Sequence, residues 1–330
     1  MNKKIKIYQF LLISTLLLVI LAGCNTDGSA NNSSAKEKEG KASESIRIGY
    51  QKGNTLNILR ESGVLEEKLK EKDLKVEWKE FNGGGPLLEA LFTGNVDFGH
   101  ASDGAAIFAQ AGNKPLVYVG ADLPNPEGIG ILVHKSSDIK TIEDLKGKRV
   151  GAAKGGNHHY LTILALKEAG LDVDDVEWVF LSDAAQGRAA FETEKIDAFA
   201  TYDPFLAGTE IDLETINLTE GVDYGYPNRT FYFANVDYNK EQPELVDLIL
   251  EAIGESDQWA NDNKPDVVDL VSDALGIDKQ VIHRVTERRD YGVSKINEEI
   301  IATQQKQADI YFEVGLLPKE VDVSKDMPIK

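Results

Sequence analysis

The chain has 330 residues, with 36 Lys or Arg against 55 Asp or Glu, so its formal net charge is −19. A hydrophobic content of 42% is that of an ordinary globular protein, which excludes disordered, collagen-like and disulfide-scaffold classes. The negative charge removes the usual source of nucleic-acid affinity, which is the neutralisation of phosphates by Lys and Arg. We therefore expect a protein of about two folding units with no nucleic-acid partner.

Residues 1–23 have the pattern of a cleaved export signal. A basic start is followed by an apolar stretch from Phe10 to Ala22, which is too short to cross a bilayer as a mature helix. The stretch ends in Leu21-Ala22-Gly23-Cys24, and Cys24 is the single cysteine of the chain. This ending resembles the bacterial lipoprotein pattern, in which Cys24 carries lipid, palmitate included, and becomes the first mature residue. A secretory signal with an incidental cysteine is the alternative.

Residues 24–44 are expected to form a flexible tether. From Asn25 to Glu44 they include no large apolar side chain, so burial cannot offset the entropy lost on ordering them. Twenty such residues have a root-mean-square reach on the order of 25 Å. The folded part should begin near Ser45.

From Ser45 onward, short apolar runs alternate with helical patterns, which is typical of an α/β fold built from βα units around mostly parallel sheets. The expected strands are Ile46 to Tyr50, Val76 to Phe81, Val96 to Ala101, Leu116 to Ala121, Ile129 to His134, Arg149 to Ala153, Val176 to Leu181 and Ala198 to Tyr202. A Pro- and Gly-rich segment, residues 122–128, separates two βα series. Helical periodicity dominates after Gln242, with expected helices at Leu245 to Trp259, Val267 to Leu275, Lys279 to Arg289 and Glu298 to Phe312.

Several expected strands lead into helices through Gly, Asn, Ser and Asp residues. The turns are residues 51–54, 82–86, 102–104, 155–158, 182–183 and 202–204. In open α/β sheets ligands bind beyond the carboxyl ends of strands, and a helix N-terminus offers free N–H groups and partial positive charge. Gly84, Gly85, Gly155 and Gly156 would let the backbone approach an anion closely. Any one of these turns is more often an ordinary helix cap, and their repetition favours a site.

No enzyme or metal pattern accompanies these turns. The sequence lacks a phosphate-binding Gly-x-x-x-x-Gly-Lys-Ser/Thr loop, a Gly-x-Ser-x-Gly elbow, a His-Glu-x-x-His pair and a Gly-x-Gly-x-x-Gly fingerprint. His158 and His159 are adjacent, and adjacent helical residues do not share a face. We expect no catalytic residue, no metal and no cofactor.

Motifs spread along the chain resemble a known family, the substrate-binding lipoproteins of bacterial ABC importers, within the aliphatic-sulfonate group related to taurine and nitrate binders. The similar stretches include residues 46–52, 87–91, 94–99, 107–111, 116–120, 141–148, 188–191, 196–198, 202–204, 305–309 and 314–319. The resemblance implies a two-lobed clamp of the type II periplasmic-binding-protein kind, each lobe a mostly parallel sheet flanked by helices. Lobe 1 would be residues 45–123 plus 230–330 and lobe 2 residues 124–229, with crossings near 121–128 and 225–237. Such lobes close around a ligand by hinge motion.

Matching motif to motif, the resemblance implies a set of ligand-binding residues in the turns after the strands. These are Gln51, Asn54, Gly84, Gly85, Pro86, Ser102, Asp103, Gly155, Gly156, Asn157, His158, Tyr202, Asp203 and Arg289. The ligand's tail is expected against Tyr202, Phe81 and Tyr291. The chain departs from its relatives where Gly156-Asn157-His158 replaces serines and Tyr202 replaces a frequent tryptophan, so a bulkier or more polar organosulfonate, or another small anion, is compatible with it.

The resemblance implies a monomeric, non-enzymatic protein, lipid-anchored through Cys24 on the outer side of the bacterial cell membrane. It would capture an aliphatic sulfonate for sulfur uptake and deliver it to an ABC permease and its ATPase. One alternative keeps the fold and changes the ligand to nitrate, bicarbonate or a pyrimidine precursor of thiamine. The others are a surface enzyme on the same fold and a structural adhesin.

Overall fold

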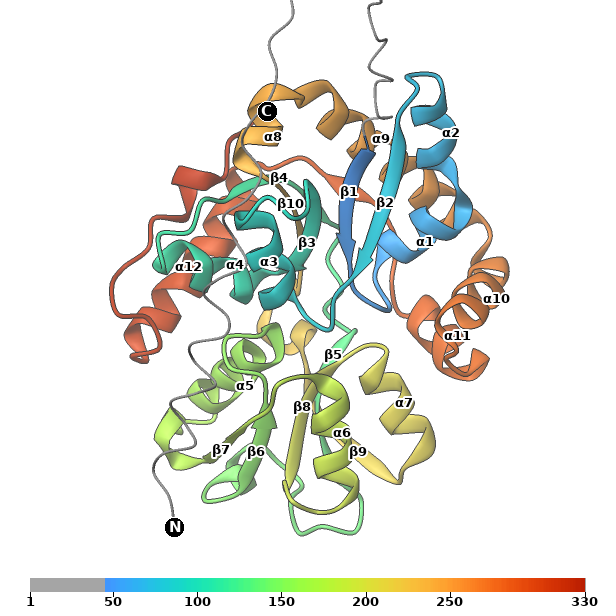
Figure 1. The fold of residues 1–330 in the computed structure, drawn as a ribbon. Coiled ribbons are helices and arrows are strands. Elements are labelled where there is room, and N and C mark those ends of the chain that lie inside the picture. Colours follow the sequence, from blue (N-terminus) through green and yellow to red (C-terminus); the bar gives the residue numbers. More distant parts are fainter. Residues whose placement is uncertain (1–44, 330) are drawn as a thin grey trace, which may run out of the picture. The chain divides into compact units, whose positions relative to one another are not determined.

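The computed structural model describes residues 45–329, which belong to one compact unit containing two β-sheets (Figure 1). The first sheet has the strand order β11-β4-β10-β3-β1-β2. Its strands are β1 (Ser45–Tyr50), β2 (Lys75–Glu80), β3 (Phe98–Ser102), β4 (Val117–Asp122), β10 (Thr230–Ala234) and β11 (Val293–Ser294). The expected signal, the lipid site at Cys24 and the tether lie outside the described residues.

The second sheet has the order β7-β6-β8-β5-β9. Its strands are β5 (Ile129–His134), β6 (Arg149–Ala152), β7 (Glu177–Phe180), β8 (Ala198–Tyr202) and β9 (Thr215–Glu220). All eight strands expected from the sequence are therefore present, whereas β9, β10 and the short β11 were not expected.

Both sheets are mixed, but most strands of each sheet point the same way, as expected: β1, β2, β3 and β4 in the first sheet, and β6, β7, β8 and β9 in the second. In the first sheet β1 pairs in parallel with β2 and β3, but β10 runs antiparallel to β3 and β4. In the second, β6 is parallel to β7 and β8, while β5 is antiparallel to β8 and β9. The physical reason is the path of the chain, because β5 and β10 each enter a sheet from a segment that arrives from the other sheet.

Helices cover the faces of these sheets. In the first two thirds of the chain they are α1 (Thr55–Ser62), α2 (Val64–Lys70), α3 (Gly84–Phe92), α4 (Asp103–Ala111), α5 (Asn157–Glu168), α6 (Ala184–Glu192) and α7 (Phe205–Asp212). The C-terminal third supplies α8 (Val236–Glu241), α9 (Pro243–Asp262), α10 (Lys264–Leu275), α11 (Lys279–Glu287) and α12 (Glu298–Glu313). Short 3₁₀ helices lie at Glu143–Leu145, Val173–Asp175, Gly221–Tyr224 and Val323–Asp326. Among residues 45–329, none of the helices combines the length and apolarity that crossing a membrane requires.

The long helix α9 shows how the sequence pattern produces the packing. Pro243 starts the helix, where its missing N–H is not needed. Leu245, Val246, Ile249 and Ile253 recur three or four residues apart, so they share one face, and all four are buried in a cluster with the strand residue Ile48. Each buried aliphatic side chain contributes about 1.5–3 kcal/mol.

An Arg–Asp ion pair with the same geometry occurs at the start of each βαβ series. In the first sheet the Arg47 guanidinium donates to both carboxylate oxygens of Asp97, at 3.0 Å and 2.5 Å. In the second sheet Arg149 donates to Asp197 at 3.0 Å and 2.6 Å. Each Asp also accepts its partner's backbone N–H at 2.8 Å, so the first strand is tied to the segment that precedes the third strand.

Residues 123–128 and 221–229 connect the two sheets, and a packed layer of aromatic side chains joins them on one side. Phe108 on α4 and Tyr160 on α5 both pack edge-on against Tyr311 on α12, with ring centroids 5.4 Å and 5.5 Å apart. The Tyr311 hydroxyl donates to the Gly156 carbonyl at 3.3 Å. This layer fixes the start of α5 against the first sheet.

Candidate functional site

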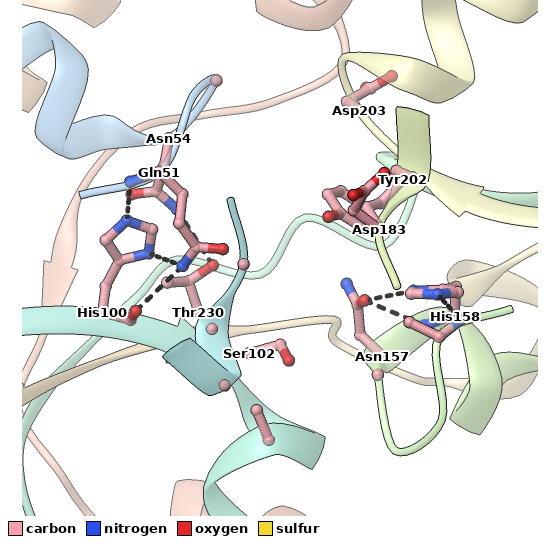
Figure 2. Close-up of a pocket in the computed structure, with 18 of the residues that line it drawn as sticks. Gln51, Asn54, His100, Ser102, Asn157, His158, Asp183, Tyr202, Asp203 and Thr230 are labelled. Carbon is pink, nitrogen blue, oxygen red and sulfur yellow. Dashed lines mark hydrogen bonds between the residues drawn. The ribbon is translucent and has the colours of Figure 1, made fainter. Parts of the chain in front are cut away.

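A cavity of about 520 Å³ lies between the carboxyl ends of the strands of the two sheets. Figure 2 shows Gln51, Asn54, His100, Ser102 and Thr230 of the first sheet facing a second group, which is made of Asn157, His158, Asp183, Tyr202 and Asp203. The connecting segments complete the wall with Leu123, Asn125, Gly128 and Asn228. The site is therefore assembled from both βα series.

Helix N-termini converge on this cavity, and those of α3, α4 and α5 have no side-chain cap. Asn54 and Asp183 cap α1 and α6 by accepting from the backbone N–H groups of Leu56 and Gln186. By contrast, Gly83 before α3 and Gly156 before α5 supply no side-chain cap. The N–H groups of Gly84, Gly85 and Asn157 thus remain available to an anion, whereas the His158 N–H donates to Asn157 Oδ1 at 3.0 Å. Helices α3 and α5 come from different sheets.

Most of the residues expected to bind ligand line the cavity. These are Gln51, Asn54, Gly84, Gly85, Pro86, Ser102, Gly155, Gly156, Asn157, His158, Tyr202, Asp203 and Arg289. Asp103, Phe81 and Tyr291 do not line it. Lining places a residue at the site, and which residues touch the ligand stays a prediction.

Asp103 is buried beneath the cavity instead of facing it. Its carboxylate accepts from the Tyr226 hydroxyl at 2.5 Å and from the Gly104 N–H at 2.6 Å. Gln307 of α12 adds a third donor at 3.3 Å. Burial raises the pKa of Asp103 to about 6, against the lowering effect of these hydrogen bonds. In this structure the Asp103 carboxylate ties the first turn of α4 to Tyr226 and to α12 and does not face the cavity.

Phe81 and Tyr291 point into packed regions. Phe81 continues the pairing of β2, since its N–H donates to the Tyr50 carbonyl at 2.9 Å. Its ring packs on the core beside Gly49, so pleating turns it away from the cavity. Tyr291 is buried in the cluster formed with α10 and α11. Three aromatic residues were expected at the ligand's tail, and of these Tyr202 lines the cavity.

Two imidazoles at the cavity are uncharged. His100 accepts the Gln51 N–H on Nε2 at 3.1 Å, and His158 accepts the Ala153 N–H on Nε2 at 2.8 Å. Burial lowers the pKa of each to about 3, with the neighbouring His159 adding to the effect on His158. Each histidine therefore fixes the turn after a strand and brings no positive charge to a ligand.

The charged side chains that line the cavity nearly balance. Lys52, Lys154 and Arg289 contribute positive charge, while Asp122, Asp183 and Asp203 contribute negative charge. Arg289 is held by Asp122, with Nη2 3.3 Å from Oδ2. Burial raises the pKa of Asp203 to about 6, an effect that the nearby Arg288 opposes. An anion would consequently depend on local N–H donors more than on a free cation.

Sequence reasoning missed lining residues that come from the connecting segments and from inside strands. Asn125 and Asn228 belong to the connections, Thr230 is the first residue of β10, and the Asn157 side chain donates to Asn228 Oδ1 at 2.7 Å. Asparagines beside prolines in segments expected to cross between lobes were the available signal. His100 lies within β3, where no sequence signal separates it from a core residue. Among residues 45–329, no group of three or more His, Cys, Asp or Glu side chains is arranged to hold a metal ion.

Comparison with known proteins identifies relatives over nearly the whole described part. The family description NMT1/THI5 like matches residues 69–266. A protein of Escherichia coli (strain K12) named for binding aliphatic sulfonates is 36% identical over 281 residues, covering 85% of this chain and 87% of its own. The solved alkanesulfonate-binding protein SsuA from Xanthomonas axonopodis pv. citri, bound to MOPS, aligns with a TM-score of 0.81 and 31% identity, covering 86% of this chain and 97% of its own.

An enzyme shares the fold at greater distance. The desulfurization enzyme DSZB aligns with a TM-score of 0.64 and 16% identity, covering 87% of this chain and 97% of its own. Identity this low shows a common fold alone. The expectation of a two-sheet α/β fold of the periplasmic-binding-protein kind is confirmed by these alignments.

Proposed function

Because the chain belongs to the NMT1/THI5-like family, we propose that it is an extracytoplasmic solute-binding protein that captures an aliphatic sulfonate for an ABC permease and its ATPase. The observation that carries the proposal is the pair of uncapped helix N-termini, α3 and α5, facing one cavity from two sheets. The names of the Escherichia coli and Xanthomonas relatives support the sulfonate as ligand class.

The sulfonate head would be held by hydrogen bonds from backbone N–H groups at Gly84, Gly85 and Asn157. Charge-assisted hydrogen bonds contribute about 1.5–3 kcal/mol each, so these three supply about 4.5–9 kcal/mol, comparable with the roughly 8 kcal/mol of a micromolar complex before association costs. Burial of the ligand's tail would offset those costs. The apolar tail would lie against Tyr202, Leu123 and Phe108, which line the same cavity. Short-range donors suffice here because surface charge is screened beyond about 8–10 Å.

Ligand capture would occur by closure of two lobes, residues 45–123 plus 230–330 and residues 124–229. The two connecting segments would bend, and the aromatic layer of Phe108, Tyr160 and Tyr311 would mark the side on which the lobes stay in contact. Anchoring through lipid on Cys24 and a monomeric state belong to the same proposal. A non-enzymatic role is supported by the named binding proteins, whereas the enzyme DSZB resembles the chain in fold alone.

The proposal is tested by calorimetric titration of residues 45–330 with methanesulfonate, hexanesulfonate, taurine and MOPS. Nitrate, bicarbonate and an aminopyrimidine form the comparison arms. We expect heat and micromolar affinity with sulfonates. Binding of a comparison ligand with every sulfonate silent would reject sulfonates as the ligand class, and catalytic turnover of a sulfonate would reject the transport role.

Gly85→Ala tests the anion position. A Cβ at Gly85 meets no protein atom within 4 Å, so the methyl group enters open space at the start of α3. Alanine should raise stability by up to about 1 kcal/mol because it favours helix, while sulfonate affinity falls at least about tenfold. Gly254→Ala in α9 is the matched control, since its Cβ also meets nothing within 4 Å and the residue lies away from the cavity. Equal sulfonate affinity in the two variants would show that the N-terminus of α3 does not bind the ligand.

A further inference from the structure

Asp257 on α9 is a buried carboxyl group that the proposed binding scheme does not use. Its exposed fraction is 0%, and neither carboxylate oxygen has a hydrogen-bond partner among residues 45–329. An ionised carboxylate without donors is costly to bury. The side chain therefore needs either a proton or a nearby positive charge.

Two charged groups of the cavity wall lie close enough to affect Asp257. Asp122, at the end of β4, and Arg289, just after α11, both line the cavity, whereas Asp257 does not. Asp122 accepts from the Tyr232 hydroxyl, from Thr55 Oγ1 at 3.4 Å and from Arg289 Nη2 at 3.3 Å. The Nε of Arg289 is buried and has no hydrogen-bond partner among the described residues. One turn after Asp257 on α9, the Asn261 side chain donates to the Tyr291 carbonyl and accepts the Tyr291 N–H, both at 2.9 Å. The part of α9 that carries Asp257 therefore packs on the segment that carries Arg289.

The charge of this cluster depends on one proton. With Asp257 protonated, Arg289 and Asp122 cancel, and an incoming anion adds one negative charge to the enclosed group. With Asp257 ionised, the cluster already carries one negative charge, and the anion adds a second in a region of low dielectric. Anion binding must then be weaker, unless a proton from solvent first neutralises the Asp257 carboxylate.

We propose that Asp257 is a proton-exchanging positioning residue, which binds a proton from water when an anion occupies the cavity beside Arg289. Anion affinity accordingly rises as pH falls. The inference rests on the proposed function, because it assigns a regulatory partner to the same site. Burial and the neighbouring Asp122 raise the pKa of Asp257 to about 8, against the opposing effect of Arg289, so the exchange falls within an accessible range.

Burial also raises the pKa of Asp122, but Arg289 and the hydroxyl donors Tyr232 and Thr55 lower it, and Asp257 has no such donors among the described residues. We therefore assign the exchanging proton to Asp257 and the negative charge to Asp122. The remaining titratable groups around the cluster do not change charge in that range. The phenols of Tyr232 and Tyr291 have pKa values raised by burial and stay neutral. Arg289 stays protonated because Asp122 and Asp257 oppose the effect of its burial, and its pKa is raised. Asp203, which faces Arg289 from the second sheet, has a pKa of about 6 and is already ionised near neutral pH.

The test measures hexanesulfonate affinity of the intact chain without its signal from about pH 7 to about pH 9.5, a range in which this ligand does not titrate and the Asp203 carboxyl is ionised. We expect roughly tenfold weaker binding at the alkaline end, and proton uptake seen as a calorimetric heat that differs between phosphate and Tris buffers. Asp257→Asn should bind with an affinity that is nearly independent of pH. Asp262→Asn, an exposed aspartate on the same helix, should keep the pH profile of the parent chain.

A flat profile in the parent chain, or an unchanged slope in Asp257→Asn, would overturn the inference while leaving sulfonate binding intact. Asp257→Leu provides an apolar variant should the amide disturb Arg289. Infrared spectroscopy of the ligand-free chain tests the same proton without any ligand. A protonated-carboxyl band near neutral pH that disappears as pH rises past about 8 and is missing in Asp257→Asn supports the inference. Absence of that band contradicts it, even if no sulfonate binds.

Discussion

Arg289 and Asp122 form an ion pair across 3.3 Å in the cavity wall, with side-chain exposures of 8% and 3%. Asp122 ends β4, and Arg289 lies in the segment after α11. The C-terminal part of the chain therefore contributes to a site that is otherwise built from the βα units. Arg289 was expected at the site from its motif, whereas its partner was not. The positive charge of the Arg289 guanidinium is therefore already balanced by the Asp122 carboxylate when no ligand is bound.

Replacing one partner of this ion pair should lower the free energy of unfolding far more than replacing both partners together. Arg289→Met leaves the Asp122 carboxylate buried without its cation, and we expect a loss of about 3–5 kcal/mol in the free energy of unfolding. The double variant Arg289→Met, Asp122→Asn should recover most of that loss. Urea unfolding of the single and double variants measures the difference, and equal destabilisation by both would show that the pairing has no energetic role.

Gly155 should be intolerant of a side chain for two reasons that a control can separate. Its φ is +77°, and a Cβ would lie 2.6 Å from the Phe108 ring. Gly170 has a φ of +73° but nothing within 4 Å, so Gly170→Ala measures the backbone cost alone, about 1–2 kcal/mol. Gly155→Ala should lose about 1–3 kcal/mol more, because the ring must move. Thermal unfolding of the two variants compares them, and equal losses would mean that Phe108 yields freely.

Asp103 should make the fold less stable as pH rises through the range between its unfolded and folded pKa values. The ordinary pKa is 3.8 and burial raises it to about 6, so the folded chain keeps a proton that the unfolded chain has lost. Stability from this group is then complete below about pH 4 and falls by about 3 kcal/mol by about pH 6. Asp103→Asn, which does not titrate, should gain stability relative to the parent above pH 6. Parallel curves of unfolding free energy against pH would contradict the assignment.

Trp178 should report ligand binding through a short chain of contacts. Its ring lies 4.5 Å from His159, whose Nδ1 accepts the Gly155 N–H at 3.1 Å. An anion at the start of α5 alters this turn, so we expect a change in tryptophan emission on ligand addition. Trp178→Phe should abolish most of that change. Trp259→Phe, which alters a tryptophan packed with α10 and α11, should preserve it.

The sequence allowed much of the fold to be predicted because the local patterns were strong. The runs around Ile48, Ile131 and Phe199 identified strands, and the spacing of Leu245, Ile249 and Ile253 identified α9. Strand β10 was missed although Phe231, Tyr232 and Phe233 are all buried, because an isolated apolar run says nothing about its partners. Its antiparallel place between β3 and β4 depends on the path between the sheets.

The candidate site divides in the same way. Gly84, Gly155 and Asn157 could be placed from turn chemistry, since a residue directly after a strand lies at the carboxyl edge of its sheet. Asp103 shared that position and was wrongly expected to face the cavity, because Tyr226, 123 residues later, draws its carboxylate inward.

The sequence by itself determined where strands give way to helices, and hence that a row of N–H donors lies at the edge of each sheet. Backbone propensity and short-range hydrogen bonding decide such features within a few residues. Only the tertiary structure decided that both edges face one cavity, that His100 and His158 are neutral there, and that Arg289 is paired with Asp122. It also decided that the buried Asp257 carboxyl has no hydrogen-bond partner among residues 45–329. Burial and charge pairing depend on residues distant in the chain, so no local pattern could reveal them.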